Sequence, residues 1–247
     1  MGESADQAFT AERVPLALGD RRLWRVTETG TVDHAATETV GSTATEASAT
    51  AFEVRAEDGR LTYRAVTSSG VFETAGAGSD ALSLAIGTVE LLRFGLRAGE
   101  GVRLVDRNVS ADVDGDGRVD NVNLQIDFLV VGFESVTVPA GTFAHAARVR
   151  TTAVVVMTPG AGGAVTVTTM ADEWYASGVG AVRSSATTRI TGQADSVSTD
   201  ELVAYGVDGR RSDTVAPRIS SLTPSDGGVV AALAGPITIR FSEAVDP

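Results

Sequence analysis

The sequence predicts an all-β protein in which consecutive strands form an antiparallel meander. Valine and threonine recur throughout the 247 residues, and their branched Cβ atoms favour pleated strands. Short segments of alternating apolar and polar residues follow one another, separated by turns that contain glycine or proline. No segment shows a convincing helical period. Because strands joined by short turns pair with their neighbours in the chain, we expect a meander.

The strands expected before residue 112 differ in clarity. The Thr- and Ala-rich run 37–51 fits either a long, weakly patterned strand or a low-complexity loop. Residues 52–55 and 61–66 are expected to form a hairpin, because Asp58-Gly59 between them favours a tight turn. Further strands are expected at residues 23–27, 89–94 and 102–105.

The second half of the chain has the clearest strand patterns. Between residues 122 and 130 every second residue is large and apolar, which indicates a half-buried strand. Pro139 and Gly141 in the segment 136–143 favour a tight turn that reverses the chain. Long strands are expected beyond this turn at residues 147–157, 164–175 and 181–190.

The segment 112–123, DVDGDGRVDNVN, has the pattern of a calcium-binding loop. Side-chain oxygens occupy loop positions 1, 3, 5, 9 and 12, and glycine occupies position 6. The predicted ligands are Asp112, Asp114, Asp116, the backbone carbonyl of Arg118, Asp120 and Asn123. Four carboxylates this close in the chain repel one another without a cation. The alternative is a solvated acidic turn, but the position of Gly117 favours calcium.

The flanks and the last residue of this loop refine the predicted site. An EF-hand would have a helix on each side, whereas a strand pattern follows this loop, so we expect it inside a β-hairpin connection. Asn123 stands where calcium loops usually have a bidentate glutamate, so one charge is missing. We therefore expect weak binding, with a Kd on the order of 10⁻⁴–10⁻³ M, and magnesium fits less well because it retains waters.

Charge and composition exclude several classes of partner. The net charge of −12 disfavours nucleic acids and anionic membrane surfaces. The chain has no cysteine, which excludes disulfides, thiolate metal sites and thiol nucleophiles.

No apolar run approaches the ~20 residues of a transmembrane helix, and residues 1–6 lack the apolar core of a signal peptide. The chain is thus either cytoplasmic or the mature part of an exported protein, and a calcium loop favours an extracellular, cell-surface or periplasmic location.

The C-terminal segment resembles the start of a bacterial Ig-like domain of the type found in tandem on surface proteins. The residues that carry this resemblance are 213–217, 221–227, 236–239 and 241–247. The resemblance covers residues 213–247 and lacks the later strands of such a sandwich. It implies an incomplete Ig-like β-sandwich segment and an extracellular context.

The larger part of the chain resembles a poorly characterised group of bacterial secreted and lipoprotein-like β domains. The shared marks are the segment 14–19 before Trp24, the VTVPAGTF segment 136–143 and the EWYASGVG segment 173–180. The group is similar to lipoprotein-carrier-like folds, so the resemblance implies a curved antiparallel meander or partial barrel over roughly residues 14–190. It implies no molecular activity.

These observations give an expected domain organisation. We expect an antiparallel β domain at 1–207 with the calcium-type loop at 112–123, a linker at 208–216, and an incomplete bacterial Ig-like domain at 217–247. The last segment could instead pack on the preceding domain.

No residue of the chain is assigned a catalytic or cofactor-binding role. His34 and His145 have neither a metal-binding partner at helical spacing nor a nearby nucleophile. The glycine-rich segment 76–80 lacks the lysine of a phosphate-binding loop, since the chain has no lysine. Trp174 and Tyr175 either line a ligand pocket or belong to the core.

Two functions are compatible with these features. The first is a non-catalytic extracellular or cell-surface module, stabilised by calcium, that binds or adheres to an unknown protein, glycan or lipid. The second is a carrier that holds an apolar ligand or a lipid in a half-barrel cavity. A hydrolase that uses the acidic loop is disfavoured, because no general base or nucleophile accompanies the loop.

Overall fold

The computed structural model describes residues 7–31, 33–46, 49–55, 61–76, 79, 81–113, 115–159, 163–207, 209–212, 219–223 and 238–241. The chain divides into two compact units, Met1–Ser212 and Asp213–Pro247. Among the described residues, no helix combines the length and the apolar character needed to cross a lipid bilayer.

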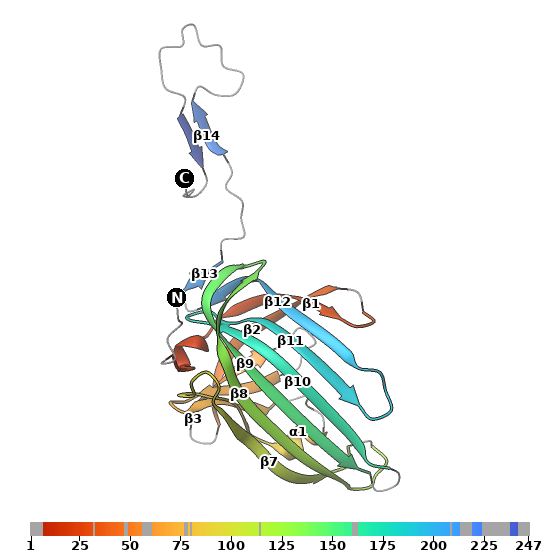
Figure 1. Cartoon of the computed structure of the whole chain (residues 1–247). Helices are drawn as coiled ribbons and strands as arrows, with labels where there is room; N and C mark the ends of the chain where they lie inside the picture. The colour runs from red at the N-terminus through yellow and green to blue at the C-terminus, as the bar shows by residue number, and fades with distance from the viewer. Residues whose placement is uncertain are drawn as a thin grey trace. The chain divides into compact units, whose positions relative to one another are not determined.

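The first unit is a single large antiparallel sheet (Figure 1). Its strands are β1 (Arg21–Glu28), β2 (His34–Glu46), β3 (Ala49–Arg55), β4 (Leu61–Val66), β5 (Gly70–Ala75), β6 (Val89–Arg93), β7 (Gly101–Ala111), β8 (Asp120–Val138), β9 (Gly141–Thr158), β10 (Val165–Ala176), β11 (Gly180–Ile190), β12 (Ser196–Val207) and β13 (Arg210–Arg211). The spatial order is β6-β5-β4-β3-β2-β1-β12-β11-β10-β9-β8-β7, and β13 pairs with β12.

This order consists of two six-stranded meanders joined by one non-sequential pair, β1 with β12. The two edge strands, β6 and β7, follow each other in the chain and lie in contact. The sheet is therefore nearly closed into a barrel, which confirms the predicted all-β, partial-barrel fold class. Near closure removes most of the exposed strand edge that an open sheet of this size would present.

The seam between β6 and β7 is covered by the N-terminal segment and by a short helix. The Phe9 N–H donates to the Leu96 carbonyl, and the Gly95 N–H donates to the Phe9 carbonyl, both at 2.8 Å. The Phe9 ring is fully buried and packs against other aromatic rings of the core, with centroid distances of 5.4–5.9 Å to Phe94, Phe128 and Tyr175. Helix α1 (Ala81–Ile86) contacts β7, whose Arg107 donates to the Ile86 carbonyl.

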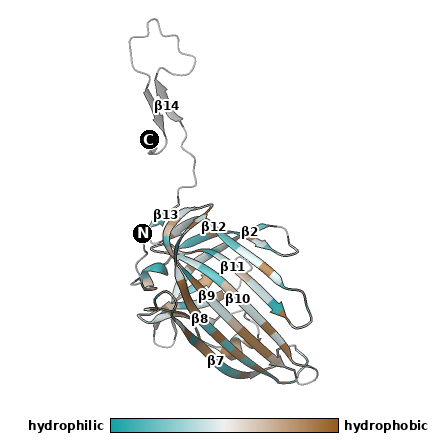
Figure 2. Cartoon of the chain, in the orientation of Figure 1, coloured by the Kyte–Doolittle hydropathy of each residue, from teal (hydrophilic) through white to brown (hydrophobic). Residues whose placement is uncertain are grey.

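The clearest sequence patterns are confirmed in β8 and its hairpin with β9. Alternate residues from Val122 to Val130 are buried on one face of β8. Figure 2 shows hydrophobic residues concentrated on β7, β8 and β9. The predicted turn brings Val138 opposite Gly141, which has a φ of +136° that favours glycine.

Other parts of the sheet differ from the sequence analysis. The run 37–51 contributes to two strands, β2 and β3, which pair with each other through an irregularity between Val40 and Thr43. Strands β5, β12 and β13 and the helix α1 were not predicted, and neither was the 3-10 turn η1 (Ala11–Arg13). The expectation that no segment is helical is wrong for Ala81–Ile86, a helix of only six residues and too short for a recognisable apolar period.

The second unit contains two described strands, β14 (Ile219–Thr223) and β15 (Thr238–Phe241), which pair antiparallel. Residue 208 and residues 213–218, 224–237 and 242–247 lie outside the described residues. The Ig-like character of this unit therefore stays a prediction. So does the linker at 208–216, of which the structure describes residues 209–212, with the short strand β13 paired to β12.

Candidate functional site: the interior of the barrel

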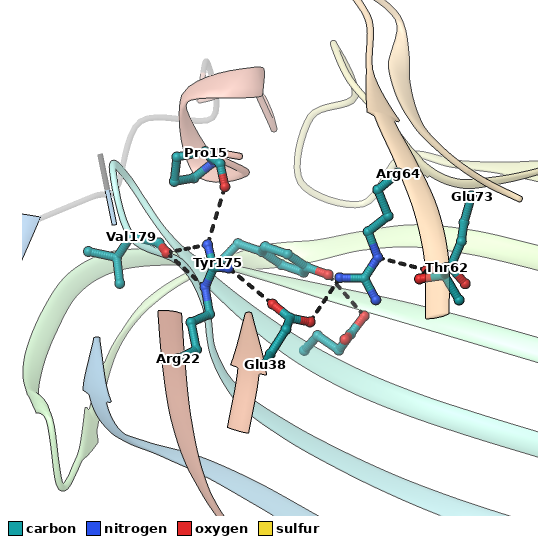
Figure 3. A network of polar contacts seen from close by, with 9 residues as sticks. Pro15, Arg22, Glu38, Thr62, Arg64, Glu73, Tyr175 and Val179 are labelled. Atoms are coloured by element: carbon teal, nitrogen blue, oxygen red, sulfur yellow. Dashed lines mark hydrogen bonds and ion pairs between the residues drawn. The ribbon is translucent and has the colours of Figure 1, made fainter. Parts of the chain in front are cut away.

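Ion pairs from four strands line one wall of the barrel interior (Figure 3). The antiparallel register places Arg22 of β1 opposite Glu38 of β2, and Arg64 of β4 opposite Glu73 of β5. Glu38 bridges the two arginines, accepting from Arg22 Nη1 and from Arg64 Nη1 at 3.0 Å each. Arg64 Nε donates to Glu73 Oε2 at 2.7 Å, and the Thr62 hydroxyl donates to the same oxygen at 3.2 Å. Each of these carboxylates is thus matched by arginine.

Arg22 connects this wall to two other parts of the chain. Its side chain is only 6% exposed. Its Nη2 donates to the carbonyl oxygens of Pro15 at 3.2 Å and Val179 at 3.1 Å. Gly180 has a φ of +98°, and a Cβ there would lie 2.8 Å from Arg22 Nη2. The left-handed backbone therefore favours glycine at the second glycine of the SGVG turn, and a Cβ there would displace the end of the Arg22 side chain.

Strands β10 and β12 carry carboxyl groups of the second cavity that, among the described residues, form no ion pair with arginine. Glu173 of β10 lies opposite Ser184 of β11, and Ser184 lies opposite Asp200 of β12, so the three form one row across the sheet. The Tyr175 hydroxyl donates to Glu173 Oε2 at 3.2 Å. Among the described residues, neither Glu173 nor Asp200 has an arginine ion pair, in contrast to Glu38.

The pKa values of the interior carboxyl groups shift in different directions because the groups have different surroundings. Burial acts to raise the pKa of Glu38, but Arg64 and Arg22 outweigh it and hold that pKa below its ordinary value. Burial raises the pKa of Glu173 and of Asp200. Burial, together with the nearby Glu173, also raises the pKa of the Tyr175 hydroxyl well above its ordinary value.

Two adjoining cavities occupy the interior, with volumes of about 520 and 480 Å³. Residues that line both cavities are Trp24, Ala36, Glu38 and Arg64. The remaining walls are largely apolar and include Val89, Leu124 and Ile126 in the first cavity and Val26, Val66 and Leu91 in the second. Each volume falls within the range of small-molecule sites. The nearly closed sheet is thus too wide for its side chains to fill, as in barrels that hold a ligand.

The arrangement can bind a small molecule. Apolar walls can cover the body of a ligand, and the row of charged and hydroxyl groups can orient a polar group. Both histidines of the chain, His34 and His145, are exposed, and neither lines a cavity.

The acidic loop joins β7 to β8 as a hairpin connection, with β7 and β8 paired on either side. Both oxygens of Asp112 accept backbone N–H groups within the loop, from Gly115 at 2.8 Å and from Gly117 at 3.0 Å. Asp116 Oδ1 accepts the Arg118 N–H at 2.7 Å. These bonds shape the turn around its left-handed glycines, whose φ values are +75° and +83°.

The other predicted calcium ligands lie at the start of β8 or outside the described residues. Asp120 is fully buried and accepts the Val113 N–H at 2.9 Å. Asn123 lies three residues further along β8, where its Nδ2 donates to Asn108 Oδ1 at 3.0 Å. Asp114 is outside the described residues. Within the part of the chain that the structure describes, no three acidic or histidine side chains form a group that could hold a metal.

The adjacent aromatic residues Trp174 and Tyr175 have different surroundings. Tyr175 lines the second cavity. Trp174 packs in a separate cluster with Val182 and Leu202, and its Nε1 donates to Glu134 at 2.6 Å. Trp174 therefore belongs to the core, whereas Tyr175 both packs in the core and lines a cavity.

The interior charges were not identified from the sequence. Arg22, Glu38, Arg64, Glu73 and Asp200 come from five strands and form no local motif. Glu173 did carry a signal, because in β10 it falls in period two with Val165, Val167 and Tyr175. A charged residue in phase with apolar ones indicates an inward-facing polar group.

The fold and the cavities define a barrel-like β protein with a partly charged interior. Residues 102–191 match the family model described as DUF3108-like. This region spans β7 to β11, which include the wall with Glu173 and Tyr175 but not the strands that carry Arg22 and Arg64.

Two solved structures are similar to the chain, and no curated protein matches it. A "putative lipoprotein" from Parabacteroides distasonis has 17% identity and a TM-score of 0.46, over 81% of this chain and 100% of that one. A "putative exported protein with YmcC-like fold" from Bacteroides fragilis has 13% identity and a TM-score of 0.39, over 81% of this chain and 99% of that one.

Proposed function

We propose that this protein is a non-catalytic module that carries or binds a small, partly apolar ligand inside its barrel. The observation that carries the proposal is the pair of adjoining cavities of about 520 and 480 Å³, bounded by apolar side chains and a fixed row of polar groups. An adhesive module needs a recognition surface but no internal cavity. Of the two functions compatible with the sequence, the cavities therefore favour the carrier.

The ion pairs support this proposal because they stiffen the cavity wall before a ligand arrives. Glu38 holds two guanidinium groups, and Arg22 also fastens the N-terminal segment to the β10–β11 turn. A binding site whose polar groups are already fixed loses less conformational entropy when its ligand binds.

A pair of neighbouring alanines on β2 provides the test. Ala36 lines both cavities, whereas Ala35 is exposed. We expect the wild type to enhance the fluorescence of the uncharged probe N-phenyl-1-naphthylamine. We expect Ala36→Phe to weaken binding of the probe about tenfold by filling the cavity, while Ala35→Phe binds like the wild type. Equal binding by the two variants, with both folded by circular dichroism, would place the probe outside the barrel and refute the proposal.

We further propose that the β7–β8 loop binds calcium and that the protein acts outside the cytoplasm. The donors are the side chains of Asp112, Asp114, Asp116, Asp120 and Asn123 and the carbonyl of Arg118. Carboxylate and carbonyl oxygens suit calcium, although Asn123 would have to release Asn108 to take part. The ion would offset the mutual repulsion of the carboxylates. Recovery of the protein from the cytosolic fraction of its host would contradict the proposed location.

A further inference from the structure

The charges that line the barrel interior do not balance. Among the described residues, the two cavities together are lined by two arginines, Arg22 and Arg64, and four carboxyl groups, Glu38, Glu73, Glu173 and Asp200. The arginines are already committed to Glu38 and Glu73 by direct ion pairs. Two carboxyl groups are therefore in excess, and both line the second cavity.

The two excess groups are held close to each other by the sheet. Glu173 and Asp200 sit on β10 and β12, on either side of Ser184 of β11. Strands two apart in a sheet are separated by roughly 10 Å, so two acidic side chains in one row can face the same ligand atom.

The remaining walls of the second cavity suit an organic cation better than a metal ion. Trp24 and Tyr175 both line it, and aromatic faces attract organic cations. Val26, Val66 and Leu91 offer apolar surface for the body of a ligand. A metal ion would need at least three converging donors, and the described residues contain no such group.

An anionic ligand is disfavoured by the same count of charges. Its head group would meet the two excess carboxyl groups, and each guanidinium in the cavity already binds Glu38. A neutral ligand would displace water from the two carboxyl groups without pairing their charge, which is unfavourable. Only a cationic head both pairs with the carboxyl groups and removes their repulsion.

We propose that the ligand of the second cavity is an amphipathic organic cation, a protonated amine with an apolar body, and that Glu173 and Asp200 bind its charged group. This inference rests on the proposed carrier function and names the chemistry of its ligand. Tyr175 fixes the Glu173 carboxyl group through its hydroxyl, and Trp24 covers the ammonium.

Three probes with one alkyl chain and different head groups test this chemistry: octylammonium, 1-octanol and octanoate. By calorimetry at neutral pH, we expect octylammonium to bind about tenfold more tightly than octanol, and octanoate to bind most weakly. Glu173→Gln combined with Asp200→Asn should remove the preference for octylammonium and leave octanol binding unchanged. The control Asp106→Asn, at an exposed carboxylate of β7 outside both cavities, should retain the wild-type order.

The outcomes separate this inference from the proposed function. Equal affinity for octylammonium and octanol would overturn the cation proposal, while their binding would still support a carrier. Preferred binding of octanoate would also overturn it and would assign the head group to Arg64. Failure of all three probes to bind would refute the carrier function together with this inference. If the double variant does not fold, each single substitution is tested separately.

Discussion

At the scale of single residues, Arg22 determines how three separate segments meet. Its guanidinium binds Glu38 and the carbonyl oxygens of Pro15 and Val179, which belong to the N-terminal segment and to the β10–β11 turn. Nothing in the sequence around Arg22 distinguishes it from Arg21 or Arg25, because its role arises only from partners that are distant in the chain.

We expect Arg22→Met to destabilise the protein by about 3 kcal/mol, as loss of one partner of a buried ion pair does. The substitution leaves two carbonyl oxygens without their donor and leaves Glu38 with Arg64 as its one remaining arginine. The matched control is Arg25→Met in the same strand, where the pair with Glu201 is exposed and should contribute below about 1 kcal/mol. Urea denaturation measures both values, and equal losses would contradict the anchoring role.

At the scale of elements, the β7–β8 hairpin combines a very regular strand with an irregular acidic turn. The strand pattern extends into the loop, since buried Asp120 lies in period two with Val122. The turn is closed by bonds from Asp112 and Asp116 to backbone N–H groups. An ion would thus reinforce a turn that its own residues already shape.

Calcium at about ten times its Kd should stabilise the protein by about 1.4 kcal/mol, which corresponds to a rise in Tm of a few degrees. Asp114→Ala and Asp116→Ala should abolish this rise, because each removes a charged ligand. Asp195→Asn, in an exposed turn between β11 and β12, should respond to calcium like the wild type. Scanning calorimetry with and without calcium measures the shift, and magnesium should give less of it. An unchanged Tm in the wild type would refute the calcium site.

At the scale of the whole molecule, the barrel interior contributes opposing effects to stability as the pH changes. A carboxyl group whose pKa is raised by folding stabilises the protein in acid and loses that contribution as the pH rises through the raised pKa. Glu173 belongs to this class, and its ordinary pKa is 4.5. Asp172, its neighbour in β10, belongs to the opposite class, because Arg150 and Arg148 outweigh its burial and lower its pKa.

Glu173→Gln should therefore stabilise the protein relative to wild type at pH 7 and have little effect at pH 4. Asp172→Asn should be destabilising at pH 7, with a cost that shrinks as the pH falls through the ordinary pKa of 3.8 and below. The groups that act on Glu173 in this range are Tyr175, Arg64, Asp200 and Glu38. Urea denaturation from pH 3 to 8 measures both profiles, and profiles of the same sign would contradict the assigned environments.

The regular strands could be predicted from the sequence because their information is local. The period-two pattern of β8 and the Pro-Gly turn before β9 each depend on a few neighbouring residues, and the structure confirms both. The acidic loop was located in the same way, as a hairpin connection rather than part of a helix pair. Glu173 could also have been recognised, since its phase in β10 is visible in the sequence.

The sequence by itself determined that this chain is an all-β protein with an acidic hairpin loop, since alternation and turn residues act over short distances. Only the tertiary structure decided that β1 meets β12, that the sheet nearly closes, and that six charged side chains from six strands face two shared cavities. The physical reason is that β1 and β12, which join the two meanders, lie far apart in the chain. No local pattern encodes which strands meet or how far their charges compensate one another.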